Sequence, residues 1–151
     1  VAEALTSMAR LFDQAFGLDK MPAWLQRAGE IWAAPSSCPE LRVAVPIWRD
    51  PWIWVGSQTY AADLIERLGW TNAAAAPGAR YPHAEVAELM AASGELDAIL
   101  LPDEPYAFGP HDGPEAFPGV RTILVPGRAL FWYGPAMIEA RRVLESLTDI
   151  C

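Results

Sequence analysis

The chain has 151 residues, of which 52% are hydrophobic and 20% charged, a balance that excludes an intrinsically disordered protein and suits one folded domain. Because 11 lysines and arginines stand against 19 aspartates and glutamates, the net charge is −8, and nucleic acid is not an expected partner. No apolar run reaches the roughly 20 residues of a transmembrane helix, and the N-terminal residues lack the pattern of a signal peptide.

Two helices are predicted at the N-terminus. Apolar residues recur at helical spacing over residues 1–16, and Gly17 is placed to end that helix. A second helix is predicted over residues 22–34, because Pro22 suits a first helical turn and Pro35 ends the run.

The two cysteines, Cys38 and Cys151, are too few and too far apart for a zinc or redox motif. They could close one disulfide or remain two free thiols.

From residue 41 onward, short apolar runs alternate with helical patterns. Strands are predicted at residues 41–48, 96–102 and 120–126, and helices at residues 57–68, 84–92 and from Pro135 onward. Ser57 or Thr59 could cap the first of these helices, and Gly69 ends it. This alternation predicts an α/β fold with three layers, in which helices cover both faces of a mainly parallel, Rossmann-like sheet.

In such a sheet, ligands bind beyond the carboxyl ends of the strands. The loops that leave those ends cover residues 48–56, 102–118 and 126–134. They carry Trp48, Arg49, Trp52, Trp54, Asp103, Glu104, Tyr106, Phe108, Arg128, Phe131, Trp132 and Tyr133. A rim of aromatic rings suits a flat or partly apolar ligand, although Trp52 and Trp54 could equally cover the end of the core.

Charged side chains on this rim have two interpretations each. Arg49 and Asp50 could grip a charged ligand group or pair with each other at the surface, and the surface pair is favoured. Glu104 lies in a stiff loop directly after a strand, where a polar contact to a ligand would be placed, but it could also be a solvated carboxylate.

Metal-binding and catalytic patterns are weak. His111, Asp112 and Glu115 have the side chains of metal ligands, but the sequence around them is ordinary turn chemistry, which is favoured. His83 is expected to be exposed near a helix start. The sequence has no nucleophile elbow, no phosphate loop, no dinucleotide fingerprint and no zinc-protease motif.

Four segments carry a family resemblance when they are taken in order. They are "RVAVPIWRDPWIWVGSQTYAADLIERLGW", "RYPHAEVAEL", "DAILLPDEPYAF" and "LFWYGPAMIEA". Together they resemble the C-terminal lobe of the helical-backbone class of ABC-transporter substrate-binding proteins, which includes receptors for cobalamin, siderophores, haem and other metal chelates. The likeness covers about residues 41–147.

The resemblance implies a division of the chain. Residues 1–35 resemble the end of an N-terminal lobe with the helix that joins the lobes, and residues 36–151 resemble the α/β C-terminal lobe. Ligand is held between two lobes in this class, so the N-terminal lobe and any signal or lipoprotein segment are expected to lie outside this chain. The implied location is periplasmic or extracytoplasmic, with membrane association through the permease or a lipid anchor that this chain does not contain.

The resemblance also implies residue roles, with no catalytic residue, cofactor or resident metal. The implied ligand-binding residues are Trp48, Arg49, Trp52, Tyr81, Glu104, Tyr106, Trp132 and Tyr133. Glu85 or Glu88 would dock the permease. Rings and an arginine suit a bulky chelate better than a bare ion, and the exposed aromatic face could meet the missing lobe or a second copy of the chain.

Two other functions remain open. The chain could be a small α/β enzyme whose acid/base pair is Arg49 with Asp103 or Glu104. It could also be a scaffold or sensor lobe that kept the fold and binds no ligand.

Overall fold

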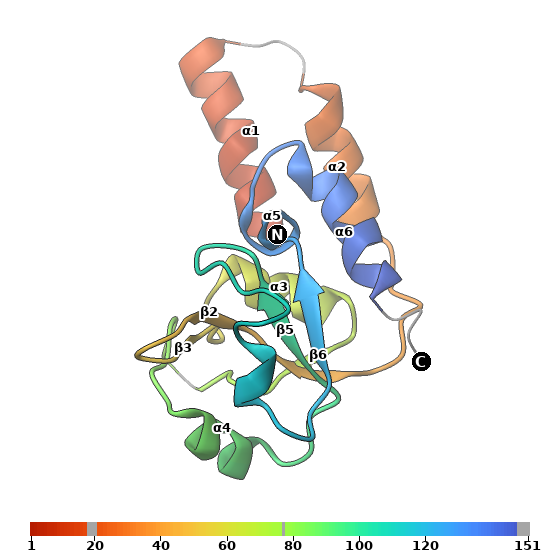
Figure 1. Ribbon diagram of the computed structural model, residues 1–151. Coiled ribbons are helices and arrows are strands. Elements are labelled where there is room, and N and C mark those ends of the chain that lie inside the picture. Colours follow the sequence, from red (N-terminus) through yellow and green to blue (C-terminus); the bar gives the residue numbers. More distant parts are fainter. Residues whose placement is uncertain (18–20, 77, 148–151) are drawn as a thin grey trace.

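A computed structural model describes residues 1–17, 21–76 and 78–147 of the chain (Figure 1). The helices are α1 (Ala2–Phe16), α2 (Ala23–Ala33), α3 (Tyr60–Arg67), α4 (Val86–Ser93), α5 (Gly127–Phe131) and α6 (Ala136–Ser146), with a short 3-10 helix, η1 (Pro114–Ala116). The strands are β1 (Arg42–Ala44), β2 (Pro46–Trp48), β3 (Ile53–Trp54), β4 (Thr71–Asn72), β5 (Ala98–Pro102) and β6 (Thr122–Val125).

Four of the strands form a parallel sheet in the order β4-β1-β5-β6. The central strand β5 is buried along its whole length. β2 and β3 form a separate antiparallel hairpin at the carboxyl end of β1. The parallel sheet with crossover helices confirms the predicted α/β class.

Successive side chains of a strand point to opposite faces of the sheet, and both faces of this sheet are covered. In β5, Ala98 and Leu100 enter the core cluster that also holds residues of α2, α3, α5 and α6. Ile99 and Leu101 enter a second cluster on the opposite face, with Leu89 of α4 and four aromatic rings. The second face is therefore covered by one helix together with aromatic side chains from the loops.

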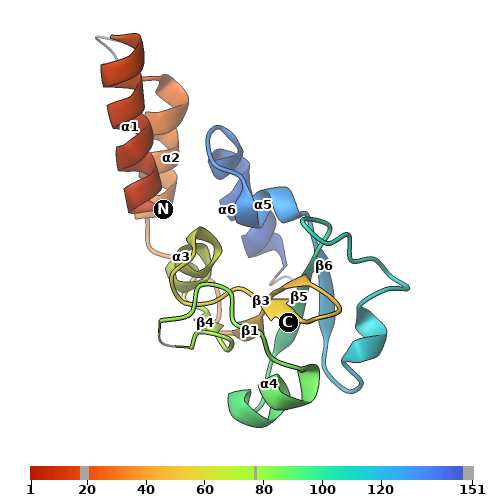
Figure 2. The same ribbon diagram turned by 90° about the vertical axis from the view of Figure 1, so that its left-hand side faces the viewer.

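The first two helices form a hairpin that projects from the end of the molecule opposite α4 (Figures 1 and 2). None of the α1 side chains is fully buried, whereas α2 buries Leu25, Ala28 and Trp32. The indole N–H of Trp32 donates a hydrogen bond of 2.8 Å to the carbonyl of Met137 in α6. α2 therefore docks on α6, while the proposed division near residue 35 stays a prediction.

The end of α2 is held by Arg141 of α6. The Arg141 guanidinium donates hydrogen bonds of 2.8 Å to the carbonyls of Ala34 and Pro35 and another to the carbonyl of Ile31. It also lies 5.8 Å from the centroid of the Trp32 ring. The last carbonyls of a helix have no partner within the helix, so this buried arginine satisfies them from outside.

The helix ends follow the local sequence. Thr59 caps α3, since its Oγ1 accepts a hydrogen bond of 3.1 Å from the N–H of Ala62, which decides between the two predicted caps. Gly17 and Gly69, the predicted stops, have φ of 56° and 79°. Positive φ is a conformation that glycine adopts without a side-chain clash.

The prediction of one strand over residues 41–48 is wrong. The chain leaves the parallel sheet after Ala44 and starts the β2–β3 hairpin at Pro46. Proline has no N–H for a ladder hydrogen bond, so it suits the point where pairing changes partner. The carbonyl of Val45 instead accepts a hydrogen bond of 2.9 Å from the N–H of Val55.

Two further predictions concern a disulfide and membrane-spanning segments. Cys38 is half-buried, and its proposed partner Cys151 lies outside the described residues, so a disulfide stays a prediction. Within the described ranges, no helix combines the length and the apolar character needed to cross a membrane.

Candidate functional site

The first strand-end loop is the turn of the β2–β3 hairpin. Trp54 is fully buried and Trp52 is 7% exposed, and their rings stack with centroids 5.8 Å apart. Phe108 and Phe117, from the loop after β5, pack against Trp52. Both tryptophans therefore cover the second face of the sheet, which decides for the second of the two interpretations that the sequence left open for them. Trp48 differs, because it is 44% exposed.

Arg49 does not pair mainly with Asp50, as was favoured from the sequence. Its guanidinium forms close ion pairs with Asp112 and Glu115, and Asp50 is more distant at 3.8 Å. Tyr106 donates a hydrogen bond of 2.7 Å to the second carboxylate oxygen of Asp112. We call the four side chains of Arg49, Tyr106, Asp112 and Glu115 the carboxylate clasp, because they tie the first loop to the second.

The clasp shifts the pKa values of two of its members. The hydrogen bond from Arg49 lowers the pKa of Glu115 below its ordinary value. The hydrogen bond to Asp112 raises the pKa of Tyr106, so its phenol stays protonated. In the clasp, Asp112 and Glu115 both pair with Arg49. The described residues contain no group of three or more His, Cys, Asp and Glu that could hold a metal ion.

Tyr81 is placed by a segment that pairs with β3. The N–H groups of Trp54 and Gly56 donate to the carbonyls of Pro82 and Arg80 at 3.0 and 2.8 Å. A Cβ on Gly56 would lie 2.7 Å from the Arg80 carbonyl oxygen and closer still to that of Ala79. Only glycine allows this close approach of the two backbones. Tyr81, which lies in this segment, is 53% exposed.

Glu104 is positioned by its neighbour and by the start of α5. The Asp103 carboxylate accepts a hydrogen bond of 2.6 Å from the N–H of Gly127. A Cβ on Gly127 would lie 2.8 Å from the Glu104 carbonyl oxygen and would collide with Glu104 Cγ. The absence of a side chain at Gly127 therefore lets the loop after β5 close onto α5, and Glu104 is held half-buried there.

These loops surround a small pocket at the carboxyl ends of the strands, which we call the mouth pocket. Its volume is about 310 Å³, and it is lined by Ile47, Tyr81, Glu104, Pro105, Phe131 and Trp132. The residues come from β2, from the segment after α3, from the loop after β5 and from α5. This convergence matches the rule that places ligand sites at the strand ends of α/β sheets.

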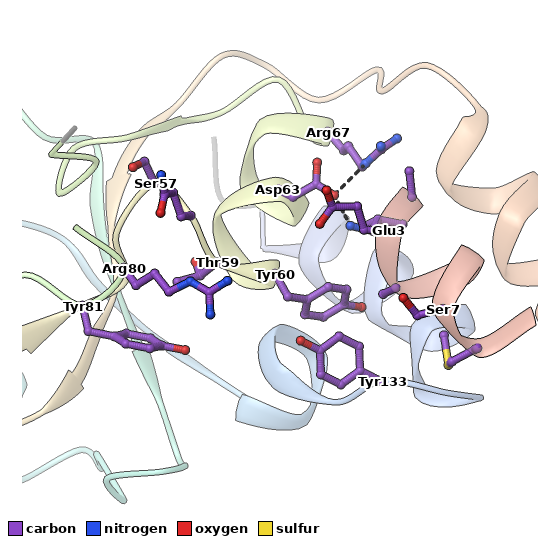
Figure 3. A pocket seen from close by; sticks show the side chains of 15 residues that line it. Glu3, Ser7, Ser57, Thr59, Tyr60, Asp63, Arg67, Arg80, Tyr81 and Tyr133 are labelled. Atoms are coloured by element: carbon purple, nitrogen blue, oxygen red, sulfur yellow. Dashed lines mark hydrogen bonds and ion pairs between the residues drawn. The ribbon is translucent and has the colours of Figure 1, made fainter. Parts of the chain in front are cut away.

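A larger groove of about 910 Å³ lies between α1, the start of α3, Arg80 and Tyr133 (Figure 3). Tyr81 lines both this groove and the mouth pocket. The rings of Tyr60 and Tyr133 face each other with centroids 4.6 Å apart. Burial raises the pKa of Tyr60, with smaller contributions from Tyr133 and Asp63, and its buried hydroxyl finds no hydrogen-bond partner among the described residues.

The eight residues predicted to bind ligand separate into three groups. Tyr81, Glu104 and Trp132 line the mouth pocket, and Tyr133 lines the larger groove. Trp48 and Tyr106 line neither space but pack edge to face, with centroids 5.6 Å apart. Arg49 is engaged in the clasp and Trp52 in the aromatic cluster, so their predicted contact with ligand has no support in this geometry.

Several functional positions were missed from the sequence. Ile47 and Pro105 line the mouth pocket, and Gly56 and Gly127 position its walls. The signal for the glycines was present, because each lies within two residues after the end of a strand beside a predicted loop. Arg80 was missed because a single arginine in an Ala/Pro/Gly segment has no pattern.

The start of α4 carries the acidic residues predicted to dock a permease. Glu88 accepts a hydrogen bond of 3.0 Å from the N–H of Glu85 and so caps the helix. The buried indole of Trp54 donates a hydrogen bond of 2.8 Å to the carbonyl of Ala84, which fixes this helix start to the aromatic cluster. Glu85 is exposed, and so is His83, as expected.

The chain therefore has a parallel α/β sheet with a small, partly aromatic pocket at its strand ends. Comparison with solved structures agrees. The chain is similar to the periplasmic haem-binding protein BhuT in complex with two haems, with a TM-score of 0.62 and 23% identity over 98% of this chain and 55% of that one.

Two further solved structures are similar to the chain at a low sequence identity and over about half of their own length. The periplasmic vitamin B12 binding protein BtuF of Vibrio cholerae gives a TM-score of 0.60 at 14% identity, over 84% of this chain and 50% of that one. The ABC-type Fe3+-hydroxamate transport system from Saccharomonospora viridis gives 0.60 at 18% identity, over 97% and 55%. The chain spans about half the length of these structures and has the fold of one lobe. No family model and no curated protein matches the sequence.

Proposed function

We propose that the chain is the ligand-binding C-terminal lobe of an extracytoplasmic receptor that delivers a metal chelate, of the siderophore, haem or cobalamin type, to an ABC importer. The observation that carries this proposal is the mouth pocket: exposed aromatic side chains converge at the strand ends of a lobe whose structural neighbours include binding proteins for haem and vitamin B12. The rings offer flat, partly apolar surface of the kind a chelate presents.

The ligand class follows from side-chain chemistry. A bare metal ion needs a compact set of histidine, cysteine or carboxylate ligands, and the described residues contain no such group. Trp132 and Tyr81 are instead 49% and 53% exposed at the pocket, so a ligand would bury them. A bulky organic chelate makes such contacts.

The proposal includes a partner and a location. Glu85 and Glu88 are both candidates for docking a basic pocket of a permease, because both are exposed at the start of α4, where their side chains form a reciprocal capping box. The receptor would act outside the cytoplasm, near a membrane through its permease or an anchor on another part of the protein. The open aromatic face would meet a second lobe, or a second copy of this chain.

The alternative function, a small enzyme, was based on an acid/base pair of Arg49 with Asp103 or Glu104, and this geometry does not support such a pair. Among the described residues, the carboxylates that pair with Arg49 are Asp50, Asp112 and Glu115, so Arg49 pairs with neither Asp103 nor Glu104. Asp103 instead accepts from the backbone of Gly127. A scaffold lobe without ligand remains the competing function.

Isothermal titration with haem, cobalamin and ferric hydroxamates tests the proposal. We expect at least one chelate to bind, and Trp132→Ala to weaken that binding. Binding of none of the three classes, either to this chain or to the chain joined to its second lobe, would favour the scaffold.

A further inference from the structure

Among the described residues that line the mouth pocket, one has a charged side chain. Glu104 supplies this charge, and the other lining residues are Ile47, Tyr81, Pro105, Phe131 and Trp132. Within the described part of the chain, no hydrogen bond or ion pair engages the Glu104 carboxylate. Glu104 is half-buried and lines the pocket, so its carboxylate is available for a ligand group that brings a positive charge.

The aromatic lining favours the same charge. Ring faces attract cations through their quadrupole, and tryptophan does so most strongly. The chain already shows this attraction at one ring of the pocket, because the Arg128 guanidinium lies 5.1 Å from the centroid of Trp132. Arg128 lies against this ring but does not belong to the described lining, so the lining itself carries no cationic side chain.

Arg49, the other arginine of the strand-end loops, already has carboxylate partners. Arg49 is held by Asp112 and Glu115 in the carboxylate clasp, on the side of the second loop. An anionic ligand group in the mouth pocket would meet Glu104 with no lining cation to offset the repulsion. The whole chain, with a net charge of −8, adds a field of the same sign.

The size of the pocket limits what it can hold. Its volume of about 310 Å³ lies at the lower end of the range of small-molecule sites, which is roughly 300 to 1,000 Å³. The pocket therefore suits one substituent of a ligand and not an entire chelate.

We propose that the mouth pocket is a subsite for an organic cation, an ammonium or quaternary ammonium group carried by the ligand, which is held by the Glu104 carboxylate and the faces of Tyr81 and Trp132. This inference rests on the proposed function for the rest of the ligand, and it narrows the chelate class to those with a cationic substituent. Chelates whose exposed substituents are carboxylates are disfavoured.

A small cation tests the subsite without a chelate. Choline and its uncharged carbon isostere, in which a tert-butyl group replaces the trimethylammonium group, are titrated into the full chain while the indole N–H resonances are followed by NMR. We expect choline to bind about tenfold more tightly than the isostere, the size of a cation–aromatic contact together with one carboxylate. Glu104→Gln should remove most of this preference, and Trp132→Ala should weaken choline binding.

The matched control is Glu66→Gln, which removes an exposed carboxylate on α3, outside the pocket lining, and should keep the preference. Circular dichroism confirms that each variant is folded. Equal binding of choline and its isostere, absence of choline binding, or an unchanged preference in Glu104→Gln would each overturn the subsite.

A second pair of probes separates this inference from the proposed function. Ferrioxamine B is a hydroxamate chelate with a free ammonium group, and its N-acetyl derivative lacks that charge. Tighter binding of the charged chelate supports both proposals. Equal binding of the two chelates overturns the cation subsite and supports the receptor, whereas a preference for choline with no binding of any chelate supports the subsite and argues against the receptor.

Discussion

At the scale of single residues, the candidate site depends on contacts that hold its loops. The carboxylate clasp joins the hairpin turn to the loop after β5, with one guanidinium between two carboxylates. Its members are each partly exposed, so the clasp contributes more to loop position than to global stability.

The clasp predicts a dependence on pH. Because Arg49 lowers the pKa of Glu115 in the folded protein, the stability that Glu115 contributes is present above its ordinary pKa of 4.5 and is lost as pH falls through the lowered value. Urea unfolding measured between neutral and acidic pH should therefore show a steeper loss of stability in this window for the wild type than for Glu115→Gln. Identical pH profiles would show that the ion pair is not formed in solution.

Gly56 is the second residue on which the site depends. In Gly56→Ala, the new Cβ would collide with the carbonyl oxygens of Ala79 and Arg80. We expect the free energy of unfolding to fall by about 3 kcal/mol, as for an overpacked core, and the Tyr81 ring to move. The control is Gly29→Ala in α2, where a Cβ meets no atom within 4 Å, and which should stabilise the protein by about 0.5 to 1 kcal/mol. Similar unfolding energies for the two variants would contradict the close approach.

At the scale of elements, the sequence predicts the longer helices better than strand partners, whereas the five-residue helix α5 lies in a segment that was predicted as a loop. Thr59, Gly17 and Gly69 act locally, so caps and stops are readable from neighbours along the chain. β4 has two residues, Thr71 and Asn72, and neither belongs to an apolar run. It is held by contacts with β1, which is distant in sequence, and no local pattern reports such pairing.

The candidate site was only partly predictable, because it also depends on contacts between residues that are distant in the sequence. The strand-end rule placed Glu104 and Trp132 on the rim, and the resemblance added Tyr81. The structure brings these three residues together around one pocket, while their contact with a ligand stays a prediction. It could not separate Trp48 from Trp54, since alternation along a strand says which rings share a face but not which face is covered. The covering rings, Phe108 and Phe117, arrive from more than 50 residues away.

The junction of α2 and α6 offers a test at this scale. Arg141 is 7% exposed and donates to three carbonyls at the end of α2. Arg141→Leu leaves these carbonyls without their donor, so the free energy of unfolding should fall by about 3 kcal/mol. The adjacent Arg142 is 74% exposed and pairs only with Glu139 among the described residues, so Arg142→Leu should change it by less than about 0.5 kcal/mol. Chemical denaturation of both variants measures the difference, and equal effects would contradict the role of Arg141.

At the scale of the whole molecule, the aromatic mouth is more open than a complete binding site. Trp48, Tyr81, Trp132 and Tyr133 are each between 44% and 57% exposed, on a chain that spans about half the length of its structural neighbours. Small-molecule sites cover about 70 to 90% of their ligand, which one wall does not achieve.

This openness predicts weak binding by the chain alone. We expect its Kd for haem, cobalamin or a ferric hydroxamate to be about 1 µM or weaker, because one wall buries only part of the ligand. Trp132→Ala should weaken the binding of whichever chelate binds by about tenfold, the value of one aromatic contact. Trp24→Ala, which removes a ring that packs on Phe12 at the far end of the helical hairpin, is the matched control and should leave the Kd unchanged. Nanomolar binding by this chain in calorimetry would contradict the prediction and would show that its own residues bury enough of the ligand.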